Sequence, residues 1–370
     1  MATEGRAGAT ASEIGPPVTE RITVLAWLKH NLFSSWFNSL LTILVGYLLY
    51  IVLVPLFRWA VLDATISGTS KEACDFGGAC WTLIKVRFGQ YIYGLYPEEQ
   101  RWRVDLAFAI AVVAMVPLFL ERFRHRLTYA VGLVVIYPVI GYALFYGGWL
   151  GLPVVETPRW GGLFLTLVIA GVGITASFPL GILLALGRRS SMPVIKSLSV
   201  AFIELVRGVP LVTVLFMASV MLPLFLPAGV NFDKLMRALV GVALFSAAYM
   251  AEVVRGGLQA IPKGQYEAAM ALGLGYWQTT GLIILPQALR LVIPGIVNTF
   301  IGLFKDTSLV TIIGLFDLLG MAKLIVTDPQ WLGLAAESYI FAAFGFWIFC
   351  FAMSRYSQYV ERRLSTGNRR

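Results

Sequence analysis

Charged and hydroxyl-bearing residues stand inside long apolar stretches of this 370-residue chain. They form two groups, Glu204 with Arg207 and the run Lys305, Asp306, Thr307 and Ser308. A charge at the centre of a membrane helix costs about 2.5–3.5 kcal/mol on insertion scales, so a retained charge has a partner or a function. Cations, carboxylates and hydroxyl groups together complement a small zwitterion. The alternative is that these residues neutralise each other and stabilise helix packing, and both interpretations stay open.

Residues of the kinds used in catalysis or metal binding are few. The sequence holds two histidines, His30 and His125, and three cysteines. Their spacing does not supply the ligands of a zinc site, so we predict no metal. A Gly-x-x-x-x-Gly-Lys-Ser/Thr loop for nucleotide phosphates is absent from the sequence. We therefore expect no catalytic residue, no bound cofactor and no ATP hydrolysis by this chain itself.

Cys74 and Cys80 enclose five residues, two of which are glycine. An oxidising compartment would allow them to form a disulfide across this small ring. Two free thiols in a glycine-rich turn are the other interpretation, and the sequence does not decide between them. The third cysteine, Cys350, lies in an apolar stretch.

The composition indicates which solvent surrounds these residues. Hydrophobic residues make up 58% of the chain and charged residues 13%, with a mean hydropathy of +0.78. A soluble domain has about 25% charged residues, which excludes a soluble enzyme or regulator. Eight stretches are long and apolar enough to cross a bilayer: 39–57, 105–121, 127–147, 161–187, 197–226, 237–254, 288–304 and 338–357. We predict an all-α polytopic membrane protein with about eight transmembrane helices.

Two of the eight stretches contain helix breakers. Pro210 and Pro223 interrupt 197–226, and the short stretch 288–304 contains Pro294. Breaks within a membrane are tolerated where neighbouring helices or a polar cavity satisfy the freed backbone groups. The pattern indicates a helix bundle with an internal pathway.

Charge in the loops predicts the orientation of the chain. Lys and Arg concentrate in the short segments on one side, such as Arg122, Arg124 and Arg126, and Arg188, Arg189 and Lys196. Positive residues favour the cytoplasmic side, which places both termini in the cytoplasm, with a tail at 1–38 and a basic tail at 361–370. The loop 58–104 is then outside. Residues 1–38 lack the apolar core of a signal peptide, so we expect the first span to be an uncleaved anchor.

A segment of lower hydropathy, 255–287, lies on the predicted cytoplasmic side. Pro262 suits the first turn of a helix, and Gly273 suits the position just past its end. A second short helix is expected from about Tyr276 until Pro286 stops it. Large residues such as Tyr266, Met270 and Trp277 would anchor the segment in a partner; the alternative is a loop resting on lipid headgroups.

The spacing in this segment resembles the cytoplasmic signature loop of ABC-importer permease subunits, Glu-Ala-Ala, three residues, Gly, nine residues, Ile, one residue, Leu-Pro. The matching residues are Glu267, Ala268, Ala269, Gly273, Ile283, Leu285 and Pro286. In that family the loop couples the membrane subunit to its ATPase, which makes these seven the expected coupling residues. The resemblance suggests that Glu267 orients the loop by pairing with a base or a cap, and that Gly273 permits a tight turn.

Further stretches resemble the polar amino-acid branch of that family and extend the match over residues 160–360. They are Trp160-Gly-Gly-Leu163, Glu204-Leu-Val-Arg207-Gly-Val-Pro210, Ala251-Glu252-Val-Val-Arg255-Gly-Gly257, Ile261-Pro262-Lys-Gly-Gln265 and Lys305-Asp-Thr-Ser-Leu309. The resemblance implies a type I ABC-importer permease core at 158–360, built from the last five spans. The accessory region 39–157, with three spans, resembles the longer permease of general L-amino-acid importers.

The family implies the following system. The chain would be a multi-pass protein of a bacterial inner membrane and would move L-amino acids from periplasm to cytoplasm by alternating access. Its expected partners are a cytoplasmic ABC ATPase dimer that uses ATP, a second and shorter permease subunit, and a periplasmic amino-acid-binding protein, with no nucleic acid. The candidate substrate path comprises Glu204, Arg207, Lys305, Asp306, Thr307 and Ser308.

Two other functions were compared with this interpretation. A self-sufficient secondary transporter or channel would share the broken spans and intramembrane charges, but it predicts inverted repeats and leaves the signature loop unexplained. A membrane scaffold would use a docking loop but would not need charges in the bilayer. The importer interpretation accounts for more residues.

Overall fold

The structure, a computed structural model, describes residues 23–74, 77–120, 123, 125–149, 151–227 and 232–365. Arg122 and Arg124 of the orientation argument lie outside the described residues, as do 1–22 and 366–370 of the predicted tails. The chain divides into two units. One is Met1–Ala64 with Phe76–Ala79, and the other is Thr65–Asp75 with Cys80–Arg370.

Two helices, α1 (Val24–Asn31) and α2 (Trp36–Phe57), make up most of the described part of the first unit. Ser35 caps α2, because its side chain accepts a hydrogen bond from the backbone N–H of Asn38 at 3.2 Å. One π-helical turn, Arg58–Leu62, continues α2. The combined helix is predominantly apolar and long enough to cross a membrane, as predicted for the first span.

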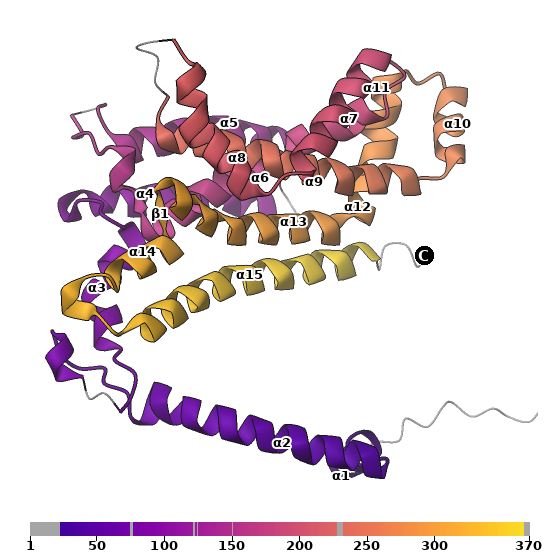
Figure 1. Ribbon diagram of the computed structural model, residues 1–370. Helices are drawn as coiled ribbons and strands as arrows, with labels where there is room; N and C mark the ends of the chain where they lie inside the picture. Colours follow the sequence, from indigo (N-terminus) through magenta and orange to yellow (C-terminus); the bar gives the residue numbers. More distant parts are fainter. Residues whose placement is uncertain are drawn as a thin grey trace, which may run out of the picture. The chain divides into compact units, whose positions relative to one another are not determined.

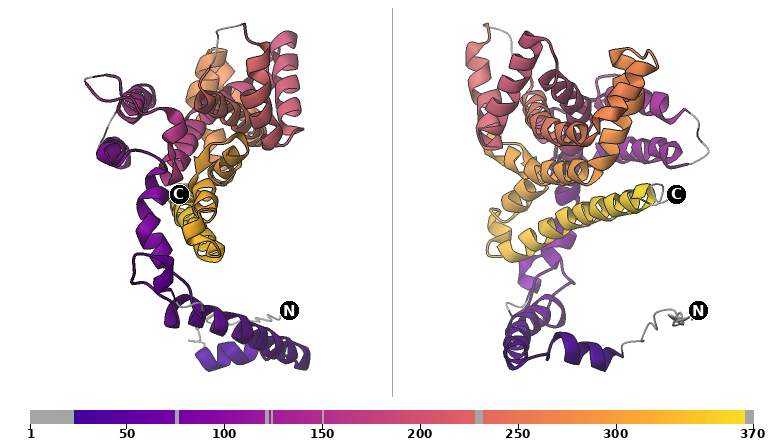
Figure 2. Two further views of the ribbon diagram at one scale, coloured as in Figure 1. Left: turned by 60° about the vertical axis from the view of Figure 1, so that its left-hand side comes forward. Right: turned by 90° about the vertical axis from the view of Figure 1, so that its right-hand side faces the viewer.

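The second unit is built from long apolar helices (Figure 1). They are α4 (Arg101–Phe119), α5 (Arg126–Tyr146), α6 (Gly162–Arg188), α9 (Lys234–Ala260), α13 (Ile293–Asp306) and α15 (Ala335–Ser365). The 3-10 helix Thr307–Ile313 extends α13, and α13 and α15 run side by side (Figure 2). Over the described residues, seven helices including α2 can cross a membrane, or eight when one bent pair counts as a span. The predicted all-α polytopic class is confirmed.

The bent pair occupies the stretch that the sequence suggested as the fifth span. α7 (Pro193–Arg207) and α8 (Leu211–Phe216) meet at 104° across residues 208–210. Pro210 cannot donate a backbone hydrogen bond and disfavours helical conformation in the residue before it, so the helix stops there. Beyond α8 the chain continues as a π-helical turn, Met217–Met221, and a 3-10 helix, Leu222–Phe225. The interruption that Pro210 predicted within 197–226 is therefore present.

α6 and α9 pack together along much of their length at the centre of the second unit. Small residues allow this approach. A Cβ atom on Gly181 would stand only 2.6 Å from the Cβ of Met250, and Ala247 and Ala251 are fully buried. Without a hydrophobic driving force in lipid, close van der Waals packing of small residues stabilises helix pairs. This pair is the frame that carries the charged residues of the site.

An accessory segment, residues 65–74 and 80–96, is fastened to the end of the second unit where α15 begins. We call it the outer strap. Its helix α3 (Thr82–Tyr93) packs against α6, α14 (Leu318–Ile325) and α15. Two contacts hold α3: Arg87 forms an ion pair with Asp328, and the hydroxyl groups of Tyr91 and Ser338 share a buried hydrogen bond.

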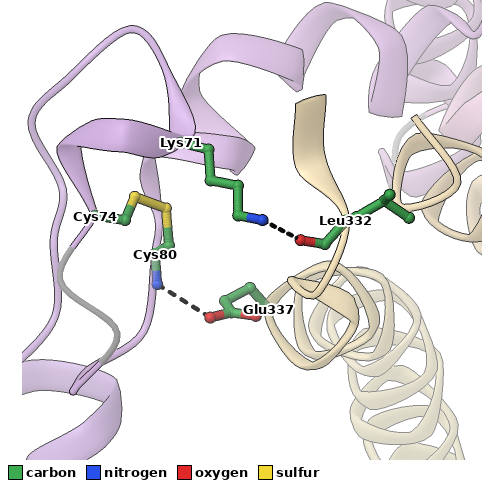
Figure 3. Close-up of a disulfide and its surroundings, with 5 residues drawn as sticks. All are labelled: Lys71, Cys74, Cys80, Leu332 and Glu337. Atoms are coloured by element: carbon green, nitrogen blue, oxygen red, sulfur yellow. Dashed lines mark hydrogen bonds between the residues drawn. A yellow bond between two sulfur atoms is a disulfide. The ribbon is translucent and has the colours of Figure 1, made fainter. Parts of the chain in front are cut away.

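The disulfide Cys74–Cys80 closes a small ring at the start of the strap, with its Cα atoms 5.6 Å apart (Figure 3). The backbone N–H of Cys80 donates to the buried Glu337 carboxylate of α15 at 3.1 Å. Lys71, in the 3-10 helix Lys71–Ala73, donates to the carbonyl oxygen of Leu332 at 2.6 Å. The start of the strap thus donates two hydrogen bonds, one to the first turn of α15 and one to the segment that leads into it.

Three glycines lie where the strap crosses the start of α6. Gly94 pairs with Trp160 in an antiparallel bridge, while Gly161 and Gly162 pair with β1 (Phe316–Asp317). A Cβ on Gly94 would stand 2.4 Å from the Cα of Gly161, and Gly162 has φ +64°. Only glycine permits both the close approach and this backbone conformation. Short 3-10 helices at Glu98–Gln100, Thr157–Arg159 and Pro329–Trp331 complete the connections.

Candidate functional site

The segment 255–287 begins with a short helix, α10 (Lys263–Ala271), with Pro262 at its N-cap. Past its end, Gly273 has φ +73° and donates to the carbonyl of Met270 at 2.9 Å, while Leu274 donates to the carbonyl of Ala269 at 3.2 Å. These two bonds are the Schellman arrangement that ends helices at glycine. The expected turn at Gly273 is thus present in the structure.

The second helix of this segment is longer than the sequence suggested. It comprises α11 (Tyr276–Gln278), a π-helical turn (Thr279–Ile284) and α12 (Leu285–Leu291). The prediction that Pro286 stops the helix is wrong. Proline's missing N–H and its clash with the preceding turn are harmful inside a regular α-helix, but here the π-helical turn changes the register and Pro286 enters the first turn of α12.

The seven signature residues divide between two environments. Ala269 is fully buried, and Ile283 and Leu285 pack against the apolar cluster that includes Ile284 and Ala288. These residues fix the segment to the helix bundle. The others, Glu267, Ala268, Gly273 and Pro286, are exposed.

Glu267 forms no ion pair with the residues that the structure describes. The hypothesis that it orients its own loop through a base is therefore not supported within the described part of the chain. Its carboxylate faces outward, beside the exposed Met270.

Large apolar side chains surround this exposed surface. They are Met270, Leu272, Tyr276, Trp277 and Leu282, each more than half exposed. Tyr266, also expected to be an anchor, is instead half-buried against the bundle, with its ring facing the Arg189 guanidinium at 5.8 Å. We call the five exposed residues the loop surface. An exposed apolar group of this kind, rimmed by polar residues, marks an interaction site.

A second group of functional residues surrounds Glu252 on α9. Arg188 Nη1, at the end of α6, donates to Glu252 Oε1 at 2.8 Å and to Glu204 Oε1 at 2.7 Å. Arg255 Nε donates to Glu252 Oε2 at 2.9 Å, and Arg207 Nη1 lies 3.8 Å from the same oxygen. Glu252 therefore joins side chains of α6, α7 and α9. We call these five residues the charge cluster.

The structure corrects the predicted pairing in this region. Glu204 and Arg207 were expected to pair with each other along one helix, but Glu204 pairs with Arg188 and Arg207 faces Glu252. Contacts with residues of other helices take the place of the expected contact between Glu204 and Arg207, which lie three residues apart on α7. Glu252 also pairs with Arg255, three residues later on the same helix. Three arginines against two glutamates leave one positive charge in excess.

Arg207 is the least satisfied cation of the charge cluster. Its closest carboxylate oxygen is 3.8 Å away, whereas Arg188 and Arg255 have contacts of 2.9 Å or shorter. Its guanidinium lies 5.6 Å from the ring centre of Tyr249, a cation–π contact. Arg207 is also the last residue of α7, directly before the break in the span.

The residues 305–308 lie at the end of α13. Lys305 is exposed and Asp306 half-buried, and neither forms an ion pair with the described residues. The hydroxyl groups of Thr307 and Ser308 donate to the carbonyls of Phe304 and Lys305, at 2.8 and 2.9 Å. The two charges are thus available to a ligand, whereas the two hydroxyl hydrogens are already used. The structure does not bring this run into contact with the charge cluster.

Within the described residues, His, Cys, Asp and Glu side chains form no group of three or more that could hold a metal ion. Comparison with known proteins then identifies the family. The profile of the family described as "Binding-protein-dependent transport system inner membrane component" matches residues 177–366. The chain is also 60% identical over 343 residues to the inner membrane amino-acid ABC transporter permease protein YhdY of Escherichia coli (strain K12), which covers 93% of this chain and 94% of that protein. The chain belongs to this family.

Another relative of this permease is the glutamate/glutamine/aspartate/asparagine transport system permease protein BztC of Rhodobacter capsulatus. It is 40% identical over 423 residues, covering 96% of each chain. Among solved structures, an amino acid ABC transporter crystallised with histidines shares 31% identity over 55% of this chain and 92% of that chain, with a TM-score of 0.49. The family match and the similarity to YhdY, rather than this structural likeness, show that the permease is a transport subunit and a multi-pass inner membrane protein.

Two residues in contact with the charge cluster or belonging to it escaped the sequence reasoning. Arg188 was assigned only to the loop charges that set orientation, and Tyr249 was not considered. A signal for Arg188 did exist, because it directly follows the apolar stretch 161–187 and charged residues at such positions commonly pair with one another. No sequence signal indicated Tyr249.

Proposed function

We propose that this chain is the membrane-spanning permease subunit of an ATP-driven ABC importer that moves L-amino acids from the periplasm into the cytoplasm. The observation that carries the proposal is the signature loop, whose apolar residues anchor it to the bundle while Glu267 and Gly273 face outward. Membership of the permease family and the names of its relatives support the amino-acid substrate.

The proposed partner of the loop surface is a cytoplasmic ATPase dimer. The exposed Met270, Leu272 and Trp277 offer large apolar anchors next to the carboxylate of Glu267. Since the sequence holds no phosphate-binding loop, ATP must be hydrolysed by another polypeptide. Closure of the two ATPase subunits would then displace α10 and, with it, the spans to which the loop is fixed.

Two further partners complete the proposed importer. A periplasmic amino-acid-binding protein would deliver substrate, and a second, shorter permease subunit would form the other half of the pathway. In this arrangement both termini are cytoplasmic, and the outer strap lies on the periplasmic side, where disulfides persist.

The proposed substrate path includes Arg207 and the run 305–308. A free amino acid presents a carboxylate and an ammonium group. The incompletely paired Arg207 guanidinium suits the carboxylate, and an ion pair with Lys305 or Asp306 suits either end of the zwitterion. Glu204 would contribute indirectly, because its carboxylate already pairs with Arg188.

Co-purification from bacterial membranes tests the assignment of partners. The tagged chain, extracted in mild detergent, should bring down an ABC ATPase and a second permease subunit. A variant with Leu272→Asp and Trp277→Asp on the loop surface should lose the ATPase but keep the second permease. A chain that purifies alone and transports amino acids with an ion gradient would support a secondary transporter instead.

A further inference from the structure

Two consecutive arginines at the end of α6 contact two different parts of the permease. Arg188 is the last residue of α6 and Arg189 is its C-cap. Arg188 lies in the charge cluster, and the Arg189 guanidinium lies over the ring of Tyr266 in the segment 255–287, which we call the coupling segment. Because Arg188 and Arg189 are adjacent in the sequence, this pair connects the coupling segment with α7, the first half of the broken span.

Arg188 holds the two other helices of the charge cluster. Its Nη1 donates to Glu204 of α7 at 2.7 Å and to Glu252 of α9 at 2.8 Å. The Arg188 side chain is 24% exposed, that of Glu252 16% and that of Glu204 54%, so solvent weakens the contact with α7 more than the contact with α9. Because Arg188 contacts both helices, a displacement of the end of α6 would act on α7 just before its break at residues 208–210.

Arg189 holds the coupling segment. Its guanidinium carbon lies 5.8 Å from the ring centre of Tyr266, which sits on α10 one position before Glu267. Tyr266 is half-buried and packs against the apolar cluster of α9 and α12, whereas Arg189 is exposed.

We propose that Arg188 and Arg189 form a transmission junction that converts displacement of α10 into movement of the broken span. Arg189 receives the displacement through Tyr266, and Arg188 passes it to Glu204 and Glu252. The two arginines are positioning residues, which touch neither substrate nor nucleotide. The inference rests on the proposed function, because it needs an ATPase that pushes α10.

The test measures coupling in the assembled transporter. The permease, its ATPase, the second permease and the binding protein are reconstituted together in lipid vesicles. Labelled amino-acid uptake and ATP hydrolysis are measured on the same preparation. The readout is the number of ATP molecules hydrolysed per amino acid imported, which a purely structural contact would not change.

Arg188→Gln and Arg189→Gln should each raise this ratio by roughly five-fold or more, the usual lower range for loss of coupling between two sites. Tyr266→Ala should reproduce the effect of Arg189→Gln, whereas Tyr266→Phe keeps the ring face and should keep the wild-type ratio. Arg290→Gln is the matched control. Arg290 is exposed on α12 and forms no ion pair with the described residues, so its ratio should not change.

Wild-type ratios for Arg188→Gln and Arg189→Gln would overturn the junction. Loss of the ATPase from the purified variant complexes would also overturn it, since the arginines would then support assembly rather than transmission. Failure of the proposed function is distinguishable from both results, because the wild-type complex itself would then show no ATP-dependent uptake.

Discussion

Arg188 and Glu252, 64 positions apart in the sequence, lie 2.8 Å apart between Nη1 and Oε1. The contact joins the end of α6 to the latter part of α9. Through the same guanidinium nitrogen, Arg188 also holds Glu204 of α7. Glu252 in turn faces Arg207 and Arg255, which makes it the anion shared by three cations.

Because Glu252 faces three arginines, Glu252→Gln should lower the free energy of unfolding. The substitution leaves three guanidinium groups without their shared carboxylate in a partly buried site. Because solvent reaches part of the cluster, we expect a cost of about 1–3 kcal/mol, below that of a fully buried pair. Thermal unfolding of the purified protein in detergent measures the effect. Glu267→Gln, at an exposed and unpaired carboxylate, should leave the melting temperature unchanged; equal melting temperatures for both variants would contradict the prediction.

Two substitutions of Gly273 distinguish the effect of an added charge on transport from the effect of backbone strain. Its φ of +73° favours glycine, and no atom lies within 4 Å of a Cβ placed there. Asn and Asp have nearly the same shape and both tolerate this conformation better than other residues. Gly273→Asp should reduce uptake to background with the protein still in the membrane, because the new charge faces the loop surface, whereas Gly273→Asn should retain most uptake. Normal transport by the Asp variant would exclude the coupling role.

The disulfide of the outer strap predicts a stability contribution. Breaking a ring of this size frees the unfolded chain and costs about 2 kcal/mol in the chain-entropy description. Cys74→Ser and Cys80→Ser should each lower the melting temperature and expose the strap to protease, and dithiothreitol should have the same effect on the wild type. Cys350→Ser, at a cysteine outside the disulfide, serves as the control. A melting temperature that neither the serine variants nor dithiothreitol alters would refute the contribution.

Asp317, next to α14, predicts a pH dependence. It is fully buried, and its Oδ1 accepts hydrogen bonds from the Gly320 N–H at 2.9 Å and the Thr311 hydroxyl at 3.2 Å. Burial raises the pKa of Asp317 from 3.8 to about 6, although these hydrogen bonds oppose the shift. The folded protein therefore binds this proton more tightly than the unfolded chain does. The resulting stability is fully present below about pH 4 and is lost as the pH rises through 6.

Comparison of the wild type with Asp317→Asn isolates that dependence. The Asn side chain does not ionise, so the wild type should lose stability relative to this variant as the pH rises from 4.5 to 7.5. The expected change is a few degrees in melting temperature, since raising the pKa from 3.8 to about 6 is worth about 3 kcal/mol and about 1 kcal/mol corresponds to about 1–2 °C in a chain of this length. Glu99→Gln, at an exposed carboxylate, should show no such trend. A constant difference between the wild type and Asp317→Asn over this range would be inconsistent with the raised pKa.

Lys305 and Asp306 predict effects on substrate handling. Neither forms an ion pair with the described residues, so alanine in their place should not break an internal contact. Lys305→Ala and Asp306→Ala should each lower uptake and substrate-stimulated ATP hydrolysis by about ten-fold, the equivalent of one charge-assisted hydrogen bond. Lys323→Ala removes an exposed positive charge from α14 and should leave both rates unchanged. Unchanged rates in the first two variants would remove these residues from the path.

Much of the fold was predictable because membrane helices have a strong local signal. The spans and the helix at Lys263–Ala271 follow from apolar length, proline and glycine positions, all of which act over a few residues. The bend between α7 and α8 was indicated by Pro210, but its size of 104° was not. The size of a bend depends on what the two halves pack against, and that information is spread along the chain.

The charge cluster shows why part of the site could not be predicted. Helical spacing reports neighbours on the same helix, such as Glu252 and Arg255. It gave the wrong partner for Glu204, because Arg188 from a different helix offers a closer contact. The prediction that Pro286 stops its helix was wrong for a related reason, because the π-helical turn before Pro286 has no clear sequence signature.

ATP-dependent uptake tests the central claim most directly. The chain is reconstituted in lipid vesicles with its ATPase, second permease and binding protein, and a mixture of labelled L-amino acids is supplied on the binding-protein side. The account predicts accumulation that requires ATP and the binding protein, and that is insensitive to dissipation of ion gradients. Accumulation by this chain alone, driven by an ion gradient and indifferent to ATP, would contradict it.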